Sequence, residues 1–241
     1  MAVARTNLPG MASAERTRID RYYRWISRFY GIHERWFEKS LREKAIEFLS
    51  PSPDERVLEI GCGTGLALRE IAQRVGPSGF SHGLDISLPM LEQAREICDS
   101  ACRPDPLLLR GNAGSLPYQD GSLDGAYMSG VLELYGHAQR VRILSEAKRV
   151  LKAESGRLAL AVMSNDGKAL GLLRFYEWVR DVLPGIIPCR SVEVDRLVSE
   201  TGFEVRRRER LRLKGVLPIE VVLLGVGSES PTSQISPDTT L

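Results

Sequence analysis

The stretch RVLEIGCGTGLAL, residues 56–68, is a short apolar run that enters a glycine-rich turn and then becomes apolar again. Residues 56–60 predict a buried strand, and residues 66–75 predict a helix. The turn between them contains Gly61, Gly63 and Gly65. Such a turn lets the backbone approach a ligand and directs N–H groups of the helix N-terminus at it. The spacing matches neither the dinucleotide fingerprint nor a P-loop. The turn therefore predicts either a nucleotide-type site of another kind or a tight strand-to-helix turn that binds no ligand.

Short β-rich runs alternate with helical patterns from residue 56 onward, which is typical of βαβ units around a mostly parallel sheet. The expected strands cover residues 56–60, 80–85, 106–110, 123–129, 157–163, 203–212 and 219–226. The expected helices cover residues 66–75, 138–151 and a segment from the N-cap Ser87 to about Asp99. Only LKGVLP separates the last two strands, which is too short for a parallel crossover, so we expect these strands to be antiparallel.

The composition fits one globular domain with additions and argues against a nucleic-acid partner. The chain has 241 residues, of which 43% are hydrophobic, enough to bury a full core. Its 33 Lys+Arg and 31 Asp+Glu leave a net charge of +2, too small for a nucleic-acid footprint. The N-terminus lacks the unbroken apolar stretch of a secretory signal, and no later run is long enough to span a bilayer. We therefore expect a cytoplasmic protein.

The cysteines and histidines predict neither a disulfide framework nor a metal site. The four cysteines form no C-x-x-C pair, and the three histidines lie far apart in the sequence. Cys98 and Cys102 are one helical turn apart, which fits two small half-buried residues better than a redox or metal pair. We expect no bound metal.

A second motif, GLDIS at residues 83–87, places Asp85 at the end of the strand that follows the glycine turn. A carboxylate there can accept two hydrogen bonds from a ribose diol, as the acid at the end of the second Rossmann strand does. Without a ligand, an Asp at a strand end is more often a helix cap. Because the glycine turn lies upstream, we favour ribose binding for Asp85.

The motifs VLEIGCGTG, GLDIS, GNAGSLPYQDGSLDG and RVLKAESGRLAL resemble, in this order, those of class I S-adenosylmethionine-dependent methyltransferases with a methyltransferase type 11 domain. The resemblance covers residues 22–225. It implies a Rossmann-like, doubly wound α/β fold, with a seven-stranded, mostly parallel sheet, an antiparallel last strand and helices on both faces. It also implies that S-adenosyl-L-methionine is the cofactor.

The chain divides into four expected segments. Residues 16–50 form an N-terminal helical cap, and residues 51–227 form the methyltransferase domain. Residues 1–15 and 228–241 are polar and without periodicity, so we predict that both are disordered.

The resemblance assigns the methionine and ribose parts of the cofactor to the first two strand ends. It implies that Gly61 and Gly63, in the turn that also holds Gly65, pass under the methionine part. It also implies that Glu59 orients the amino group of the cofactor and that Asp85 binds its ribose.

The adenine side is assigned to the following strands. The resemblance implies that Ile86 packs on adenine, that Asn112 and Ala113 lie at its edge, and that the backbone of Ser129 closes the site near the sulfonium. Family members commonly have Asp where this chain has Asn112, whose amide can accept from the exocyclic amine without the charge. Residues 153–156 also replace the family's Pro-Gly-Gly turn.

Two side chains beyond the fourth of the seven strands are candidate bases. No Asn-Pro-Pro-Tyr tetrapeptide follows this strand; the sequence SGVLELYGH stands there, which argues against adenine or glutamine amides as acceptors. His137 and Glu133 lie where an acceptor is expected, and either could take a proton from an activated carbon or a phenol. A surface loop position is the alternative for His137.

The acceptor is assigned by resemblance alone. Within the family, three stretches resemble the quinone C-methyltransferases of menaquinone and ubiquinone synthesis and bacterial phospholipid N-methyltransferases: the opening YY…FYGIHERWFE, the segment LPYQDGSLD and the ending GVLPIEVVLLG. We therefore expect a small lipophilic or aromatic acceptor. O- or N-methylation of another metabolite is the main rival, and a cofactor-binding regulatory partner is the non-enzyme alternative. In the amphipathic N-terminal segment, Tyr22 and Tyr30 are candidate residues of the acceptor pocket.

A row of basic residues in EVRRRERLRLKG, residues 204–215, predicts a charged sheet edge. Such charge commonly guards an edge against aggregation, and it could also attract an anionic membrane. We treat peripheral membrane contact, and separately a homodimer, as hypotheses.

Overall fold

The computed structural model describes residues 3–5, 39–99, 105–164, 190–213 and 217–227. Its helices are α2 (Lys39–Leu49), α3 (Leu66–Val75), α4 (Leu88–Asp99), η1 (Leu132–Leu134, a 3₁₀ turn), α5 (His137–Val150) and α7 (Val194–Thr201). Its strands are β1 (Val3–Arg5), β2 (Arg56–Ile60), β3 (Phe80–Asp85), β4 (Leu107–Arg110), β5 (Gly125–Ser129), β6 (Arg157–Met163), β7 (Phe203–Leu213) and β8 (Leu217–Val226).

The strands form one sheet in the order β1-β4-β3-β2-β5-β6-β8-β7. Strands β2 to β6 pair in parallel, whereas β8 is antiparallel to both neighbours, β6 and β7. The last strand of the chain is therefore inserted between its two predecessors as the reversed strand of the sheet. This confirms the expected Rossmann-like fold class.

Strand β1 is an addition to the seven expected strands. Residues 3–5 lie in the segment expected to be disordered, yet they pair in parallel with β4, with Val3 opposite Leu108 and Arg5 opposite Arg110. Three residues are too few to carry a periodic signal, and the partner strand lies about a hundred residues further along the chain. The pairing therefore could not be predicted from local sequence.

The predicted element bounds agree closely with the observed ones. The largest differences are of two residues. Strand β5 begins at Gly125 instead of Leu123, because Leu123 makes only an isolated bridge to Leu151, and β8 begins at Leu217 instead of Ile219. Helix α2 lies within residues 16–50, the segment expected to form an N-terminal helical cap. The candidate pocket residues Tyr22 and Tyr30 and the expected disordered tail at 228–241 lie outside the described residues.

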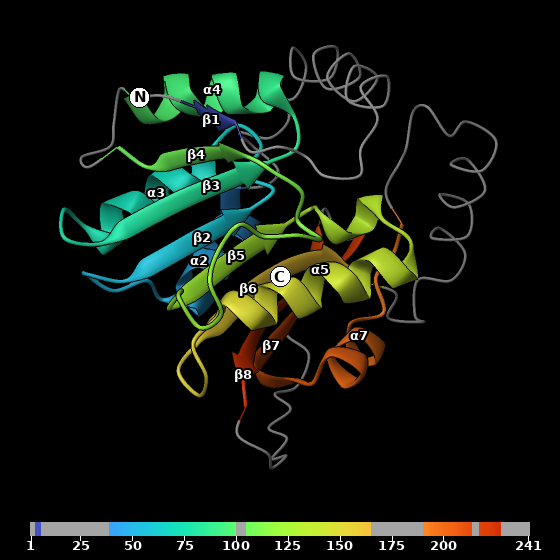
Figure 1. Ribbon diagram of the computed structural model, residues 1–241. Helices are drawn as coiled ribbons and strands as arrows, with labels where there is room; N and C mark the ends of the chain where they lie inside the picture. Colours follow the sequence, from blue (N-terminus) through green and yellow to red (C-terminus); the bar gives the residue numbers. More distant parts are fainter. Residues whose placement is uncertain (1–2, 6–38, 100–104, 165–189, 214–216, 228–241) are drawn as a thin grey trace.

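Helices cover both faces of the sheet (Figure 1). On one face, Ile46 and Leu49 of α2 and Ile71 of α3 pack on alternate strand residues such as Ala159 and Val221. On the other face, the apolar stripe of α5 packs on the larger cluster; its buried residues include Ile143, Leu144, Ala147 and Val150. These two layers fix the strand ends at which the predicted site residues lie.

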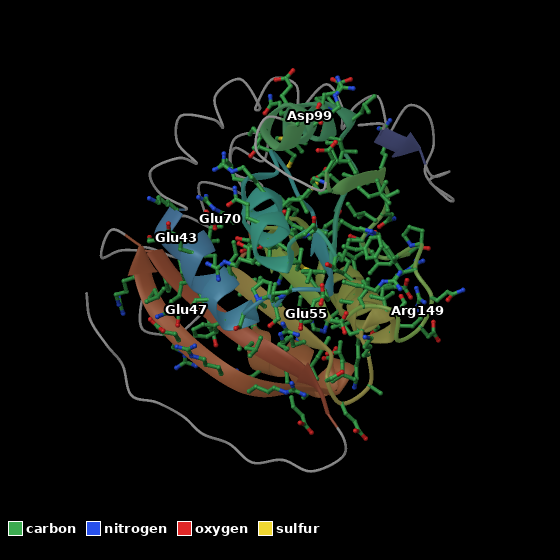
Figure 2. The ribbon with its side chains drawn as sticks, turned by 90° about the vertical axis from the view of Figure 1, so that its left-hand side faces the viewer. Glu43, Glu47, Glu55, Glu70, Asp99 and Arg149 are labelled. Atoms are coloured by element: carbon green, nitrogen blue, oxygen red, sulfur yellow. The ribbon has the colours of Figure 1, made fainter. Side chains whose placement is uncertain are left out.

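The β7–β8 hairpin holds the basic row, but the row is not continuous. The pairing register shifts between Val205 and Arg207, which breaks the alternation of side chains. Arg207 pairs with Glu47 of α2, which Figure 2 shows beside the hairpin. Arg208 lies on the other face, within 3.0 Å of Glu220. Part of the basic charge is thus neutralised within the domain.

Candidate functional site

The glycine turn between β2 and α3 has a left-handed backbone. Gly61, Gly63 and Gly65 have φ values of +73°, +49° and +80°. A Cβ at Gly61 would lie 2.3 Å from Cγ2 of Val131, and one at Gly65 would lie 2.9 Å from Cβ of Ala94. The turn is therefore wedged between the β5–α5 connection and α4, which only glycine permits.

Gly63 differs from Gly61 and Gly65 in having open space where a Cβ would lie. A Cβ at Gly63 would meet no atom within 4 Å among the described residues, so this side of the turn is open. The backbone N–H of Gly63 donates to Oδ2 of Asp85 (2.9 Å), and the N–H of Ser87 donates to Oδ1 (2.8 Å). A third backbone N–H, that of Ile86, also donates to this carboxylate, which leaves part of its acceptor capacity for a ligand hydroxyl. The predicted ribose acid and the glycine turn are thus directly connected.

The environment of Asp85 acts on its charge in two directions. Burial raises the pKa of Asp85 above its usual value. The N–H groups of Ser87, Gly63 and Ile86, together with the charge of Arg110, oppose that shift. The surroundings are therefore arranged to stabilise a carboxylate whose burial disfavours ionisation.

Glu59 and Ile86 lie on either side of this connection. Glu59 is buried on β2, two residues before Gly61. The carbonyl of Ile86, directly after β3, accepts from Nε of Arg110 at the end of β4 (3.1 Å). The ends of β2, β3 and β4 are consequently held at one edge of the sheet.

Asn112 and Ala113 form a tight turn at the same edge. The N–H of Gly111 donates to the carbonyl of Asp85 (3.0 Å), which places this turn beside β3. Oδ1 of Asn112 accepts from the N–H of Gly114 (2.8 Å), and Ala113 is buried. The amide oxygen expected to accept from adenine is therefore already engaged in its own turn, with one lone pair remaining.

The end of β5 completes the edge. Ser129 is the last residue of β5 and pairs with Ala161 of β6. Gly130 follows with φ +66°, and Val131 then packs against the glycine turn. Ser129 is therefore placed on the same edge as Gly61.

Glu133, one of the two candidate bases, is buried between the ends of β5 and β6. It is 4% exposed, and its Oε1 accepts from the N–H of Met163 (2.8 Å), whereas Oε2 has no hydrogen-bond partner among the described residues. Burial raises the pKa of Glu133 to about 7, although two N–H groups and the charge of Arg140 oppose the shift. This carboxylate can exchange a proton near neutral pH.

His137, the other candidate, lies at the first residue of α5. Its Nε2 is 2.8 Å from Oε2 of Glu200 on α7, and both side chains are 37% exposed. Arg196 pairs with the same Glu200. The structure thus separates the two candidates and places His137 in a surface contact between helices.

Arg140 has a position that the sequence interpretation missed. It is only 7% exposed, and it donates to the carbonyls of Leu132 (2.8 Å), Arg190 (3.2 Å) and Ser191 (2.9 Å). The sequence feature that could have revealed this position is an arginine on the apolar stripe of α5, one turn before Leu144. It fixes η1 against the chain that enters α7.

Two absences concern the described part of the chain. No cluster of three or more His, Cys, Asp or Glu side chains there could hold a metal ion. No helix in those ranges is long and apolar enough to cross a membrane.

Comparison with known proteins agrees with this geometry. A family model described as "Methyltransferase domain" matches residues 57–154. The demethylmenaquinone methyltransferase of Geobacillus kaustophilus is 26% identical over 227 residues, covering 88% of this chain and 93% of that protein. The 24-methylenesterol C-methyltransferase 2 of Oryza sativa is 28% identical over 239 residues, covering 88% of this chain and 53% of that protein.

A solved structure shows the same fold. The methyltransferase in the complex with the Trm112 activator of Haloferax volcanii superposes with a TM-score of 0.67 and 17% identity, covering 87% of this chain and 99% of that one. The chain spans about half the length of the first curated relatives it matches. With the glycine turn, the strand-end carboxylate and the reversed β8, these findings support the expected assignment of the chain to the class I S-adenosylmethionine-dependent methyltransferases.

Proposed function

We propose that this protein transfers the methyl group of S-adenosylmethionine to a small lipophilic or aromatic acceptor, with a quinone ring carbon as the first candidate. The observation that carries the proposal is the pair of hydrogen bonds from the N–H groups of Gly63 and Ser87 to Asp85. These bonds join an open glycine turn to a carboxylate that retains acceptor capacity for a ligand. The pair lies at the carboxyl edge of a doubly wound sheet, where such sheets bind nucleotides.

The described residues fit the cofactor. Gly61 and Gly63 would lie under its methionine part, because the backbone at Gly63 is open on one side. Glu59 would face its amino group, and Asp85 would accept from the ribose hydroxyls. The adenine and sulfonium sides would be formed by Ile86, Asn112, Ala113 and Ser129.

When bound, S-adenosylmethionine supplies an electrophilic methyl group, so the protein must mainly align the acceptor and exclude water. A ring carbon that gains a methyl group must lose a proton. We assign this proton to Glu133, because its carboxylate is buried beside the ends of β5 and β6 and its pKa is raised to about 7. His137 is a weaker candidate, since it is engaged with Glu200 on the surface.

The acceptor class is supported by the named relatives. One is named for demethylmenaquinone and another for C-methylation of a sterol. Both are compatible with an apolar acceptor. Phospholipid N-methylation, or O- or N-methylation of another metabolite, is the alternative reaction. A cofactor-binding regulatory role is the non-enzyme alternative. Membrane contact and a homodimer stay predictions.

The test is transfer of label from methyl-labelled S-adenosylmethionine to a demethylated quinone and, in parallel, to a cell extract that is then partitioned between organic, aqueous and macromolecular fractions. We expect label in the organic fraction, lost in Asp85→Ala and reduced in Asp85→Asn. Asp124→Ala is the matched control, because Asp124 also accepts a backbone N–H, that of Arg56, at the opposite edge of the sheet. Cofactor binding without transfer would favour the regulatory alternative, and label confined to the other fractions would move the acceptor to another class.

A further inference from the structure

The segment between β4 and β5 runs along one side of α5. This segment, residues 111–124, contains the Asn112–Ala113 turn and is otherwise free of helix and strand apart from isolated bridges. Its backbone polar groups need partners from elsewhere, because a sheet ladder does not supply them. Many of these partners are side chains of a single helix.

Three residues of α5 form a polar stripe at helical positions i, i+4 and i+7: Arg142, Glu146 and Arg149. Nε of Arg142 donates to the carbonyl of Gly114 (2.7 Å). Oε2 of Glu146 accepts from the N–H of Leu116 (2.7 Å). The stripe therefore contacts successive positions of the segment, starting one residue after Ala113.

Arg149 continues the contact at the far end of the stripe. Its two terminal nitrogens donate to the carbonyls of Tyr118 (2.8 Å) and Leu116 (3.0 Å). Asp120 accepts a further bond from it (2.6 Å). Arg149 is labelled in Figure 2, where it projects from α5 into a dense group of side chains.

The stripe is also held together internally. Arg149 donates to both carboxylate oxygens of Glu146, at 2.8 and 2.9 Å. These hydrogen bonds hold the pKa of Glu146 below its usual value, with Arg142 adding a favourable charge. Arg149 and Glu146 thus form one ion pair with fixed geometry, and Arg142 adds its charge beside this pair.

We propose that this stripe positions the adenine edge of the cofactor site, with Arg142 as the positioning residue nearest the ligand. This inference rests on the proposed function, because it takes Asn112 and Ala113 as the adenine contacts. Arg142 donates to the carbonyl of Gly114, the residue that follows Ala113. The N–H of Gly114 in turn donates to Oδ1 of Asn112. Arg149 acts further along the segment, so its loss affects folding more than binding.

The experiment measures affinity for S-adenosylhomocysteine and for adenosine by calorimetry, together with thermal unfolding. For Arg142→Ala we expect about tenfold weaker binding of both ligands, since both carry adenine, with little change in Tm. Arg142→Lys should recover part of the loss, because an ammonium can still donate to Gly114 without the planar guanidinium geometry. For Arg149→Ala we expect a clear drop in Tm and a smaller loss of affinity.

Arg157→Ala is the matched control. Arg157 likewise donates to backbone carbonyls, those of Leu49 (2.6 Å) and Ser50 (3.0 Å), and to Glu55 (2.7 Å), but it does so at the amino edge of the sheet. This variant should lower Tm and leave ligand affinity unchanged.

Two results would overturn the positioning role. One is an unchanged ligand affinity in Arg142→Ala. The other is a loss of affinity that is proportional to the drop in Tm in every variant, the Arg157→Ala control included. If the wild-type protein binds no S-adenosylhomocysteine, the proposed function itself fails, and this outcome is distinct because it appears before any variant is made.

Discussion

The proposed cofactor half of the site, around the glycine turn and Asp85, and the proposed acceptor half, around Glu133, are built in different ways. In the cofactor half, backbone N–H groups of the glycine turn and of Ser87 converge on Asp85, and the two bonds join residues 22 and 2 positions apart. In the acceptor half, Glu133 reaches Met163, 30 residues away, and Arg140 reaches Ser191, 51 residues away. One half depends on local backbone conformation, and the other depends on buried charged side chains from distant segments.

The two halves should therefore fail differently when altered. A left-handed glycine turn is damaged by any added side chain, because the cost arises from the backbone itself. A buried carboxylate or guanidinium is damaged by losing its partner, because the remaining group stays buried without compensation. The variants below test this contrast.

The largest effect is expected in the glycine turn. Gly65→Ala combines a left-handed φ with a close approach to Ala94, so we expect it to lower the free energy of unfolding by about 2–5 kcal/mol. Gly63→Ala should cost only about 1–2 kcal/mol, because no atom opposes its Cβ. It should nevertheless weaken S-adenosylhomocysteine binding strongly. Urea unfolding and calorimetry measure the two effects.

Gly121→Ala is the control for the Gly63 variant. Gly121 also has a left-handed φ, +61°, with open space at its Cβ, and it lies shortly before the start of β5, at the amino edge of the sheet. Its stability loss should match that of Gly63→Ala, whereas its affinity should not change. Equal affinities in both variants would contradict the placement of the cofactor against Gly63.

The next effect concerns the proton of Glu133. Its pKa in the folded protein is about 7, above the value of 4.5 for an unperturbed Glu, so the folded state binds more protons between these pH values. Stability should therefore fall by about 3 kcal/mol as pH rises from 4.5 to 7 and then level off. Glu133→Gln should lack this loss, because its amide oxygen can still accept from Met163. Urea unfolding across pH measures the difference.

The same variant tests the assigned base. Turnover of the wild-type protein should rise with pH through about 7, as the carboxylate form becomes populated, and Glu133→Gln should lose most turnover while binding S-adenosylhomocysteine normally. Glu92→Gln, at an exposed position of α4, is the control. A fully active Glu133→Gln protein would limit Glu133 to a structural role.

The smallest effect is expected at His137. Its contact with Glu200 is a solvent-exposed side-chain contact, and such contacts contribute little to stability. For His137→Ala we expect turnover within about twofold of the wild-type value and unchanged cofactor affinity. Label transfer at saturating cofactor is the measurement. A drop in turnover of tenfold or more would return the base role to His137.

Much of the cofactor half could be predicted from sequence. The bounds of β2, α3 and β3 were predicted residue by residue, and Asp85 was placed at the correct strand end. The reason is that a buried strand, a glycine turn and an amphipathic helix each leave a local pattern, and consecutive parallel strands end at the same edge. The exception is Asn112, whose own turn engages its amide oxygen.

The sequence by itself determined the order of strands and helices, the glycine turn and the acid that it meets, because these depend on neighbours along the chain. Only the tertiary structure decided which polar side chains are buried and what they contact. It separated Glu133 from His137, placed Arg140 in the apolar layer, and set the stripe of Arg142, Glu146 and Arg149 against the backbone of another segment. The local sequence around a charged helix residue is the same whether its side chain faces water or contacts a carbonyl of a distant segment. Only tertiary packing distinguishes these two environments.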